Sequence, residues 1–108
     1  MEQACHPTSE QPGKGESLSR AEIDKLMENL QGWQHQDTLI SKTYPFKNYY
    51  QTIAFVNAVA WMTHKEDHHP DLAVSYNSCR VEYSTHAIGG LSINDFICAA
   101  KVDALFTL

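Results

Sequence analysis

The feature of this 108-residue sequence that most constrains its fold is a strict alternation of side-chain character over residues 79–86. One set of alternate positions is apolar or β-branched: Cys79, Val81, Tyr83 and Thr85. The positions between them are polar: Arg80, Glu82, Ser84 and His86. Because successive side chains of a strand point to opposite faces of a sheet, this period of two predicts a strand with one buried face. Only a bulge would move His86 off the polar face.

A long amphipathic helix is predicted over residues 48–67. Two rows of apolar side chains recur at helical spacing and would form a wide buried stripe. The rows are Ile53, Val56 and Ala60, and Phe55, Val59 and Met62. Pro70 disfavours helical geometry at the residue before it, so we expect the helix to end just before His68 and His69.

The other segments predict further helices and strands. Ser19 and Glu22 have the spacing of a capping box, and the helix that follows should stop at Gly32. Residues 33–37 and 39–46 are typical of two strands joined by a tight polar turn. Alternation over residues 72–77 predicts another strand, with a hairpin turn at Asn77-Ser78. Ser92 is expected to cap a last helix, whose expected inward residues are Ile93, Phe96, Ile97, Ala100 and Leu105.

The resulting order of elements is α-β-β-α-β-β-α. Hairpin-like pairs of strands with helices between and after them indicate an α+β fold, with a four-stranded antiparallel sheet covered by helices on one face. We expect a single domain over residues 19–108, since a chain of this length supports one core. Residues 1–18 are mostly polar and are predicted to be a disordered N-terminal tail.

Composition narrows the classes of function. A net charge of −5 disfavours direct nucleic-acid binding, which needs a basic patch to neutralise phosphates. No apolar run approaches the ~20 residues that cross a bilayer, and the N-terminus does not have the pattern of a signal peptide. The three cysteines, Cys5, Cys79 and Cys98, form no CxxC pair, and their odd number argues against a disulfide framework. We therefore expect a cytoplasmic protein without a membrane or nucleic-acid partner.

Histidines are the candidate functional residues. Four of the six lie between residues 64 and 86, and imidazole suits both proton transfer and metal binding near neutral pH. His64 and His68 have the spacing of the zinc motif HExxH, but Lys65 stands where that motif needs glutamate. A zinc site from His64, His68 and His86 and a surface cluster without function are the alternatives to an acid–base site. Asp95, at the third position of the last helix, would stabilise the helix start by its charge alone.

Several short motifs have a distinctive order and spacing. They are Asp67-His68-His69-Pro70, Tyr76, Ser84-Thr85-His86, Gly90-Leu91-Ser92 and Asp95, with Tyr44-Pro45-Phe46-Lys47 and residues 55–59 upstream. This pattern resembles the pterin-4a-carbinolamine dehydratase family, especially its bacterial members, over residues 19–108. The spaced His-His-Pro, His and Asp pattern is highly specific. His64 departs from the family, many of whose members carry glutamate there.

The resemblance implies dehydration of 4a-hydroxytetrahydrobiopterin, or a related 4a-hydroxypterin, to the quinonoid dihydropterin. It implies three catalytic-site histidines: His68 and His86 as the acid–base pair, and His69 chiefly binding and orienting the pterin. The implied substrate-binding residues are His69, Asp95, Ser84 and Thr85. Asp95 would hold His86 or a group of the substrate through a hydrogen bond.

The resemblance also bears on cofactors and partners. It implies no metal and no organic cofactor, a pterin as the small-molecule partner, and a functional link to an aromatic amino-acid hydroxylase that generates the substrate. It implies a homodimer or homotetramer, and Trp61, which the core stripe does not require, fits either the core or such an interface. Some members of the family serve as dimerisation cofactors of a transcription factor, so a non-catalytic interaction module is the alternative function.

Overall fold

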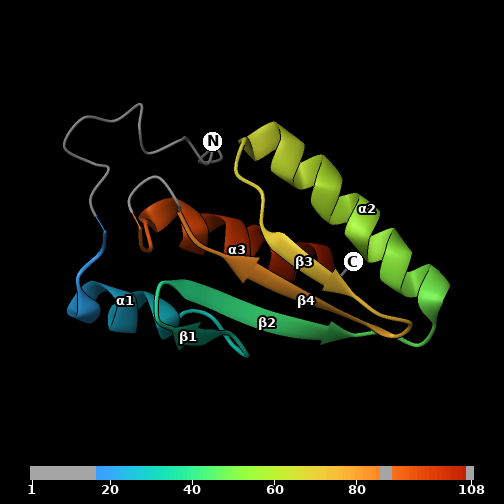
Figure 1. The fold of residues 1–108 in the computed structure, drawn as a ribbon, viewed down its shortest axis with the longest axis horizontal. Helices are drawn as coiled ribbons and strands as arrows, with labels where there is room; N and C mark the ends of the chain where they lie inside the picture. The colour runs from blue at the N-terminus through green and yellow to red at the C-terminus, as the bar shows by residue number, and fades with distance from the viewer. Residues whose placement is uncertain (1–16, 86–88, 107–108) are drawn as a thin grey trace.

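A computed structural model describes residues 17–85 and 89–106, and within these ranges it has three helices and four strands (Figure 1). In chain order these are α1 (Arg20–Met27), β1 (Gln34–Gln36), β2 (Leu39–Pro45), α2 (Tyr49–Glu66), β3 (Asp71–Val74), β4 (Ser78–Tyr83) and α3 (Ile93–Phe106). The strands form one antiparallel sheet in the order β1-β2-β4-β3. The predicted fold class and order of elements are confirmed.

The buried face of the sheet is built mainly from its two central strands, β2 and β4. Their register pairs Ile40 with Tyr83 and Tyr44 with Cys79, so these four side chains share one face. All four are fully buried, and so is Val81, which lies on the same face. Exposure alternates along β4 in the way that the period of two predicts.

The helices cover this face and complete the core. α2 and α3 pack against each other, and Figure 1 shows α3 behind β4. α1 lies beside α3, because Leu26 and Leu30 border the same groove as Phe96 and Ile97. The core side chains from the helices are Ile23, Phe55, Val59, Met62, Phe96, Cys98, Ala99 and Val102. None of the helices in the described ranges is long and apolar enough to span a membrane.

The buried stripe of α2 is narrower than predicted. The row of Phe55, Val59 and Met62 is buried, but the other row is half-buried and, at Ala60, exposed. Trp61 is 68% exposed and is therefore not a core residue. The reason is that α2 contacts the rest of the subunit along one side only, and a second buried row would need a neighbour there.

The buried stripe of α3 is rotated relative to the prediction. Ile93 and Ala100, which were expected to face inward, are exposed. Phe96 is buried as expected, and the other buried positions of the helix are Asn94, Asp95, Cys98, Ala99 and Val102. The rotation follows from Asp95, whose fully buried carboxylate sets which side of the helix faces inward.

The β3–β4 turn differs from its prediction, whereas the start of α1 agrees with it. The β3–β4 turn lies at Tyr76-Asn77, one residue earlier than predicted, because the Ser75 N–H donates to the Ser78 carbonyl at 2.9 Å and Ser78 already belongs to β4. At the N-terminus the predicted capping box of Ser19 and Glu22 is present.

Leu18, which was predicted to lie in the tail, is anchored to the folded part of the chain. The Leu18 N–H donates to the Leu91 carbonyl at 2.9 Å, and Leu18 packs against the core. The rest of the predicted tail, residues 1–16, lies outside the described residues.

Candidate active site

The end of α2 presents the double histidine. The helix ends at Glu66, as Pro70 predicts, and Asp67 adopts a left-handed conformation with φ 58°. The N–H groups of Asp67 and His68 both donate to the Thr63 carbonyl, at 2.8 and 3.4 Å. This hydrogen-bonded turn satisfies a carbonyl that the helix leaves open and directs the chain away from the helix axis. His68 and His69 therefore start the segment that crosses to β3.

His68 contacts Asp95, which lies 27 residues further along the chain. Nε2 of His68 lies 2.7 Å from Oδ1 of Asp95. The histidine side chain is 15% exposed and the aspartate side chain is fully buried. This contact adds His68 to the partners expected for Asp95, and the expected contact with His86 lies outside the described residues.

The second oxygen of Asp95 is occupied as well. Oδ2 accepts from the Thr85 hydroxyl at 2.8 Å and from the Ser92 N–H at 2.9 Å. The Ser92 hydroxyl lies 2.8 Å from that of Thr85. Asp95 thus caps α3 by bonding the Ser92 N–H, which adds a hydrogen bond to the charge effect predicted for it, and it also anchors His68. A buried carboxylate with this many partners is held in one orientation.

Tyr83 forms one wall of the His68 environment. Its ring stacks on the imidazole with centroids 5.2 Å apart and an interplanar angle of 27°. Its hydroxyl donates to the His68 carbonyl at 3.3 Å. Burial, followed by the negative charges of Asp95 and Glu66, raises the pKa of Tyr83. The phenol therefore stays neutral and acts as a donor over the ordinary pH range.

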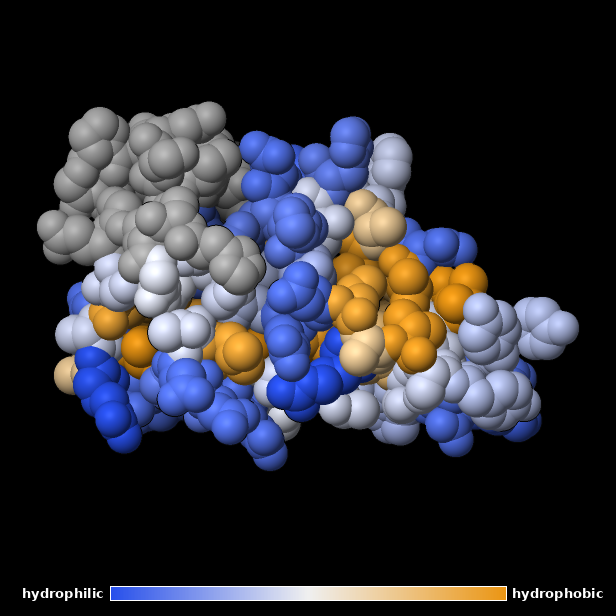
Figure 2. All heavy atoms as spheres, in the orientation of Figure 1, coloured by the Kyte–Doolittle hydropathy of each residue, from blue (hydrophilic) through white to orange (hydrophobic). Residues whose placement is uncertain are grey.

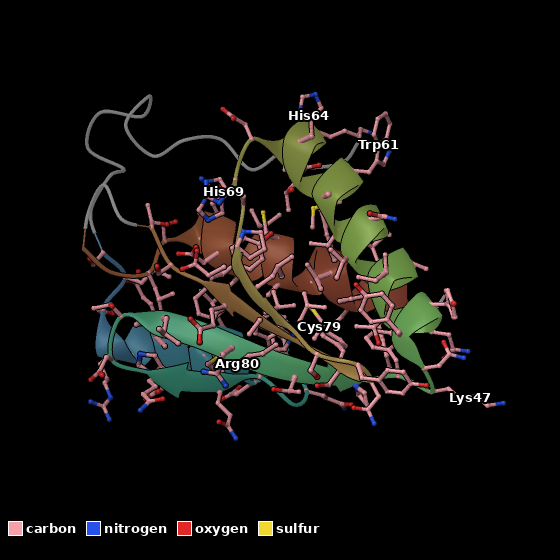
Figure 3. All side chains as sticks on the ribbon, turned by 45° about the vertical axis from the view of Figure 1, so that its right-hand side comes forward. Lys47, Trp61, His64, His69, Cys79 and Arg80 are labelled. Atoms are coloured by element: carbon pink, nitrogen blue, oxygen red, sulfur yellow. The ribbon has the colours of Figure 1, made fainter. Side chains whose placement is uncertain are left out.

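The remaining predicted site residues have different surroundings. His64 and His69 are exposed, and Figure 3 shows His64 near the end of α2 and His69 on the segment that follows it. Ser84 and Thr85 border a cavity of about 170 Å³, together with Thr38, Leu39, Asp71, Glu82, Gly89 and Gly90. Thr85 is itself buried, with its hydroxyl bonded to Asp95. His86 lies outside the described residues.

Residues 17–85 and 89–106 cover only part of the zinc alternative, because its third ligand, His86, lies outside them. Within these ranges no group of three or more His, Cys, Asp or Glu side chains could hold a metal ion. Two of the three ligands proposed for zinc, His64 and His68, are described, and His68 bonds Asp95.

The His68–Asp95 pair is suited to proton transfer. An ionised carboxylate only accepts hydrogen bonds, so Nε2 of His68 carries the hydrogen that bonds to Asp95. Nδ1 is then the nitrogen that accepts a proton in the neutral ring and donates one in the imidazolium. The carboxylate fixes both the orientation and the tautomer of the ring, as in other histidine–carboxylate pairs.

Sequence reasoning missed the contributions of Tyr83 and Thr85 to the His68 environment. Both were placed on the inner face of the predicted strand, and both are buried there. The available signal was Thr85, a polar side chain at a predicted core position. A polar group in such a position needs a buried partner, and Asp95 supplies it.

The sequence and the fold both match known proteins. Residues 16–105 match the family described as Pterin 4 alpha carbinolamine dehydratase. A protein of Nitrosospira multiformis is 65% identical over 84% of this chain and 80% of its own length. One of Xanthomonas campestris is 50% identical over 98% and 90%. Both carry the provisional name of a pterin-4-alpha-carbinolamine dehydratase.

The fold also matches that of a solved structure. A Brucella melitensis protein described as a transcriptional coactivator/pterin dehydratase has a TM-score of 0.79 and 30% identity, over 82% of this chain and 97% of its own. The fold and site thus define an α+β domain with a histidine–carboxylate pair. The chain belongs to the pterin-4-alpha-carbinolamine dehydratase family, which is a family of hydro-lyases. The predicted resemblance is confirmed.

Proposed function

We propose that this protein dehydrates 4a-hydroxytetrahydrobiopterin, or a related 4a-hydroxypterin, to the quinonoid dihydropterin and water. The observation that carries the proposal is the 2.7 Å hydrogen bond between His68 and the fully buried Asp95. It gives the chain an imidazole held in one orientation, in a family of dehydratases. General acid–base catalysis needs a positioned side chain that can accept and donate a proton.

The reaction can proceed by proton transfer alone. The C4a–O bond of the carbinolamine breaks, and a general acid protonates the departing hydroxyl so that it leaves as water. The N5 lone pair of the pterin forms the new C4a–N5 double bond, and a general base removes the N5 proton. Atoms and charges balance without a covalent enzyme intermediate, and each assisted transfer is worth typically ~10²–10⁴-fold.

Each residue of the proposed site has its own role in this reaction. His68 and His86 form the acid–base pair, with Asp95 orienting His68. His69, which is exposed, binds and orients the pterin. Ser84 contacts the substrate at the edge of the cavity, and Thr85 acts mainly through Asp95 because its hydroxyl bonds that carboxylate.

A turnover assay with a 4a-hydroxypterin tests the function. The assay follows formation of the quinonoid dihydropterin against the uncatalysed dehydration. A rate no greater than the uncatalysed one would exclude the enzyme and leave the interaction module.

We also propose an oligomeric state, a source of substrate and a cellular location for the enzyme. A homodimer or homotetramer would cover the apolar side chains that Figure 2 shows between β3 and α2, and it would pair the edge strand β3, where Val74 is 43% exposed. An aromatic amino-acid hydroxylase would supply the carbinolamine. We propose that the protein works in the cytoplasm, as its composition suggested.

An interaction module is the second candidate. The Brucella melitensis protein is described as both a coactivator and a dehydratase. Another structure, with 25% identity and a TM-score of 0.59, is described as a pterin dehydratase-like RuBisCO assembly factor. Exposed aromatic residues on α2, including Tyr50 and Trp61, favour a protein contact. The turnover assay separates this candidate from the enzyme.

A further inference from the structure

A second link joins α2 to α3 near the His68–Asp95 pair, and it is an ion pair. Nζ of Lys101 lies 2.8 Å from Oε2 of Glu66. Glu66 is the last residue of α2 and is 7% exposed, and the Lys101 side chain is 25% exposed. Neither residue takes part in the proton transfers described above, and the sequence patterns pointed to neither.

Each residue of the ion pair is connected through the chain to one residue of the His68–Asp95 pair. Glu66 precedes His68 by two residues, and the turn between them is held by the bonds from Asp67 and His68 to the Thr63 carbonyl. Lys101 and Asp95 lie on one uninterrupted helix, about 9 Å apart along its axis at 1.5 Å per residue. A change in how Glu66 sits on α3 therefore moves His68 relative to Asp95.

The charges favour one register of the two helices. α3 carries the Asp95 carboxylate near its start and the Lys101 ammonium nearly two turns later, and α2 brings the Glu66 carboxylate to the second of these. A shift of α2 toward the start of α3 would separate Glu66 from Lys101 and bring it toward Asp95, where two carboxylates repel. A largely buried ion pair adds little net stability over an apolar pair of the same size, since desolvation offsets the attraction. It does add a directional contact, which an apolar pair does not.

We propose that Glu66 and Lys101 are positioning residues, which keep the His68 imidazole on Asp95 and so set its orientation toward a 4a-hydroxypterin. The proposal deepens the proposed function and rests on it, because it assumes that the His68–Asp95 pair is the catalytic one.

The test follows the His68 ring directly, in protein whose histidine nitrogen atoms are isotope-labelled. The Nε2–H that bonds Asp95 is expected to give a downfield NMR signal protected from exchange, and the His68→Gln variant assigns it. Glu66→Gln and Lys101→Met are expected to broaden or abolish this signal and to lower kcat roughly tenfold, because small misplacements of catalytic groups are costly. KM should change by less than about twofold, since the substrate contacts remain. Lys101→Arg, which keeps the charge, should retain both the signal and kcat.

Lys42→Met is the matched control. It removes an ion pair of similar length, 3.0 Å to Asp103, from a lysine that is 22% exposed, and it acts on the same helix. It should leave the His68 signal and kcat unchanged, and urea unfolding verifies that each variant is folded. The proposal is overturned if Glu66→Gln or Lys101→Met, when folded, keeps the signal and kcat, or if Lys42→Met loses them equally. If the unmodified protein turns over no 4a-hydroxypterin, the proposed function fails, while the NMR comparison still decides the positioning.

Discussion

Asp95 binds His68 through one carboxylate oxygen and the Thr85 hydroxyl and Ser92 N–H through the other. One buried side chain therefore ties the segments that follow α2 and β4 to the start of α3. Because the histidine is the least buried of these partners, the arrangement holds an imidazole rigidly at the surface.

Asp95→Asn should lower kcat by more than its loss of unfolding free energy alone would explain. The amide has one acceptor oxygen where the carboxylate has two, so one of the three buried donors loses its partner, at a cost of about 1–3 kcal/mol of unfolding free energy. Because His68 also loses its fixed tautomer, kcat should fall by roughly 10²-fold or more. Steady-state kinetics and urea unfolding measure the two effects.

Asp103→Asn is the control for this variant. Asp103 is also on α3 and accepts hydrogen bonds from Trp33, Lys42 and Tyr44, at the other end of the helix. Its replacement should destabilise the protein comparably and leave kcat of the folded protein intact. Equal loss of kcat in both variants would mean that Asp95 acts only through stability.

The histidine variants should differ in which kinetic constant changes. His68→Ala and His86→Ala should each lower kcat by roughly 10²-fold or more, and the double variant should lose nearly all catalysis, because acid and base are both removed. His69→Ala should mainly raise KM, because a binding contact is lost. Steady-state kinetics with a 4a-hydroxypterin distinguishes these effects.

The same variants distinguish catalytic from structural histidines. His86 is predicted on the polar face of its strand, so His86→Ala should change the unfolding free energy by no more than about 0.5 kcal/mol. If that variant unfolds while its folded fraction keeps normal kcat, His86 is structural and its assignment is wrong.

Activity should not depend on a metal ion. The His68 Nε2 bonds Asp95, so this nitrogen is not free to ligate a metal ion. Chelator-treated protein should retain full dehydratase activity, and elemental analysis should find no stoichiometric zinc. Loss of activity on chelation that zinc restores would support the zinc site instead.

Stability should decline in alkaline solution because of two buried tyrosines. Burial raises the pKa of Tyr44, with a further contribution from its hydrogen bond to Asp103, and burial beside Asp95 and Glu66 raises that of Tyr83. A raised pKa means that above about pH 10 the unfolded chain releases these protons while the folded protein keeps them, so the unfolding free energy falls with rising pH. Urea unfolding on either side of that pH measures the decline, which should be shallower in Tyr83→Phe. An unchanged slope in that variant would contradict the assignment.

Assembly should involve the outer side of α2 or the edge of the sheet. Trp61 is 68% exposed and Tyr50 is 83% exposed, which is a large aromatic area to leave in water. Light scattering at micromolar concentration should report a dimer or tetramer, and Trp61→Glu should lower the assembled fraction if α2 is the interface. A protein that is only monomeric at that concentration would rule out the predicted assembly.

Local sequence patterns determined most of the fold. Alternation over residues 79–86 predicted β4 and its buried face, and the capping box predicted the start of α1. Pro70 predicted the end of α2, which places the double histidine just after the helix. These features depend on backbone geometry and on neighbours within a few residues, so the sequence expresses them directly.

The partners of the site and the rotation of the helices were decided by the tertiary structure. Nothing in the local pattern around Asp95 predicted His68 as its partner, because that contact depends on how α3 packs against the end of α2. The same packing turned Ile93 and Ala100 outward and left Trp61 exposed. Periodicity shows that a helix has a buried side, but the neighbours that cover this side, and the buried hydrogen bonds that must be satisfied there, determine which residues it includes.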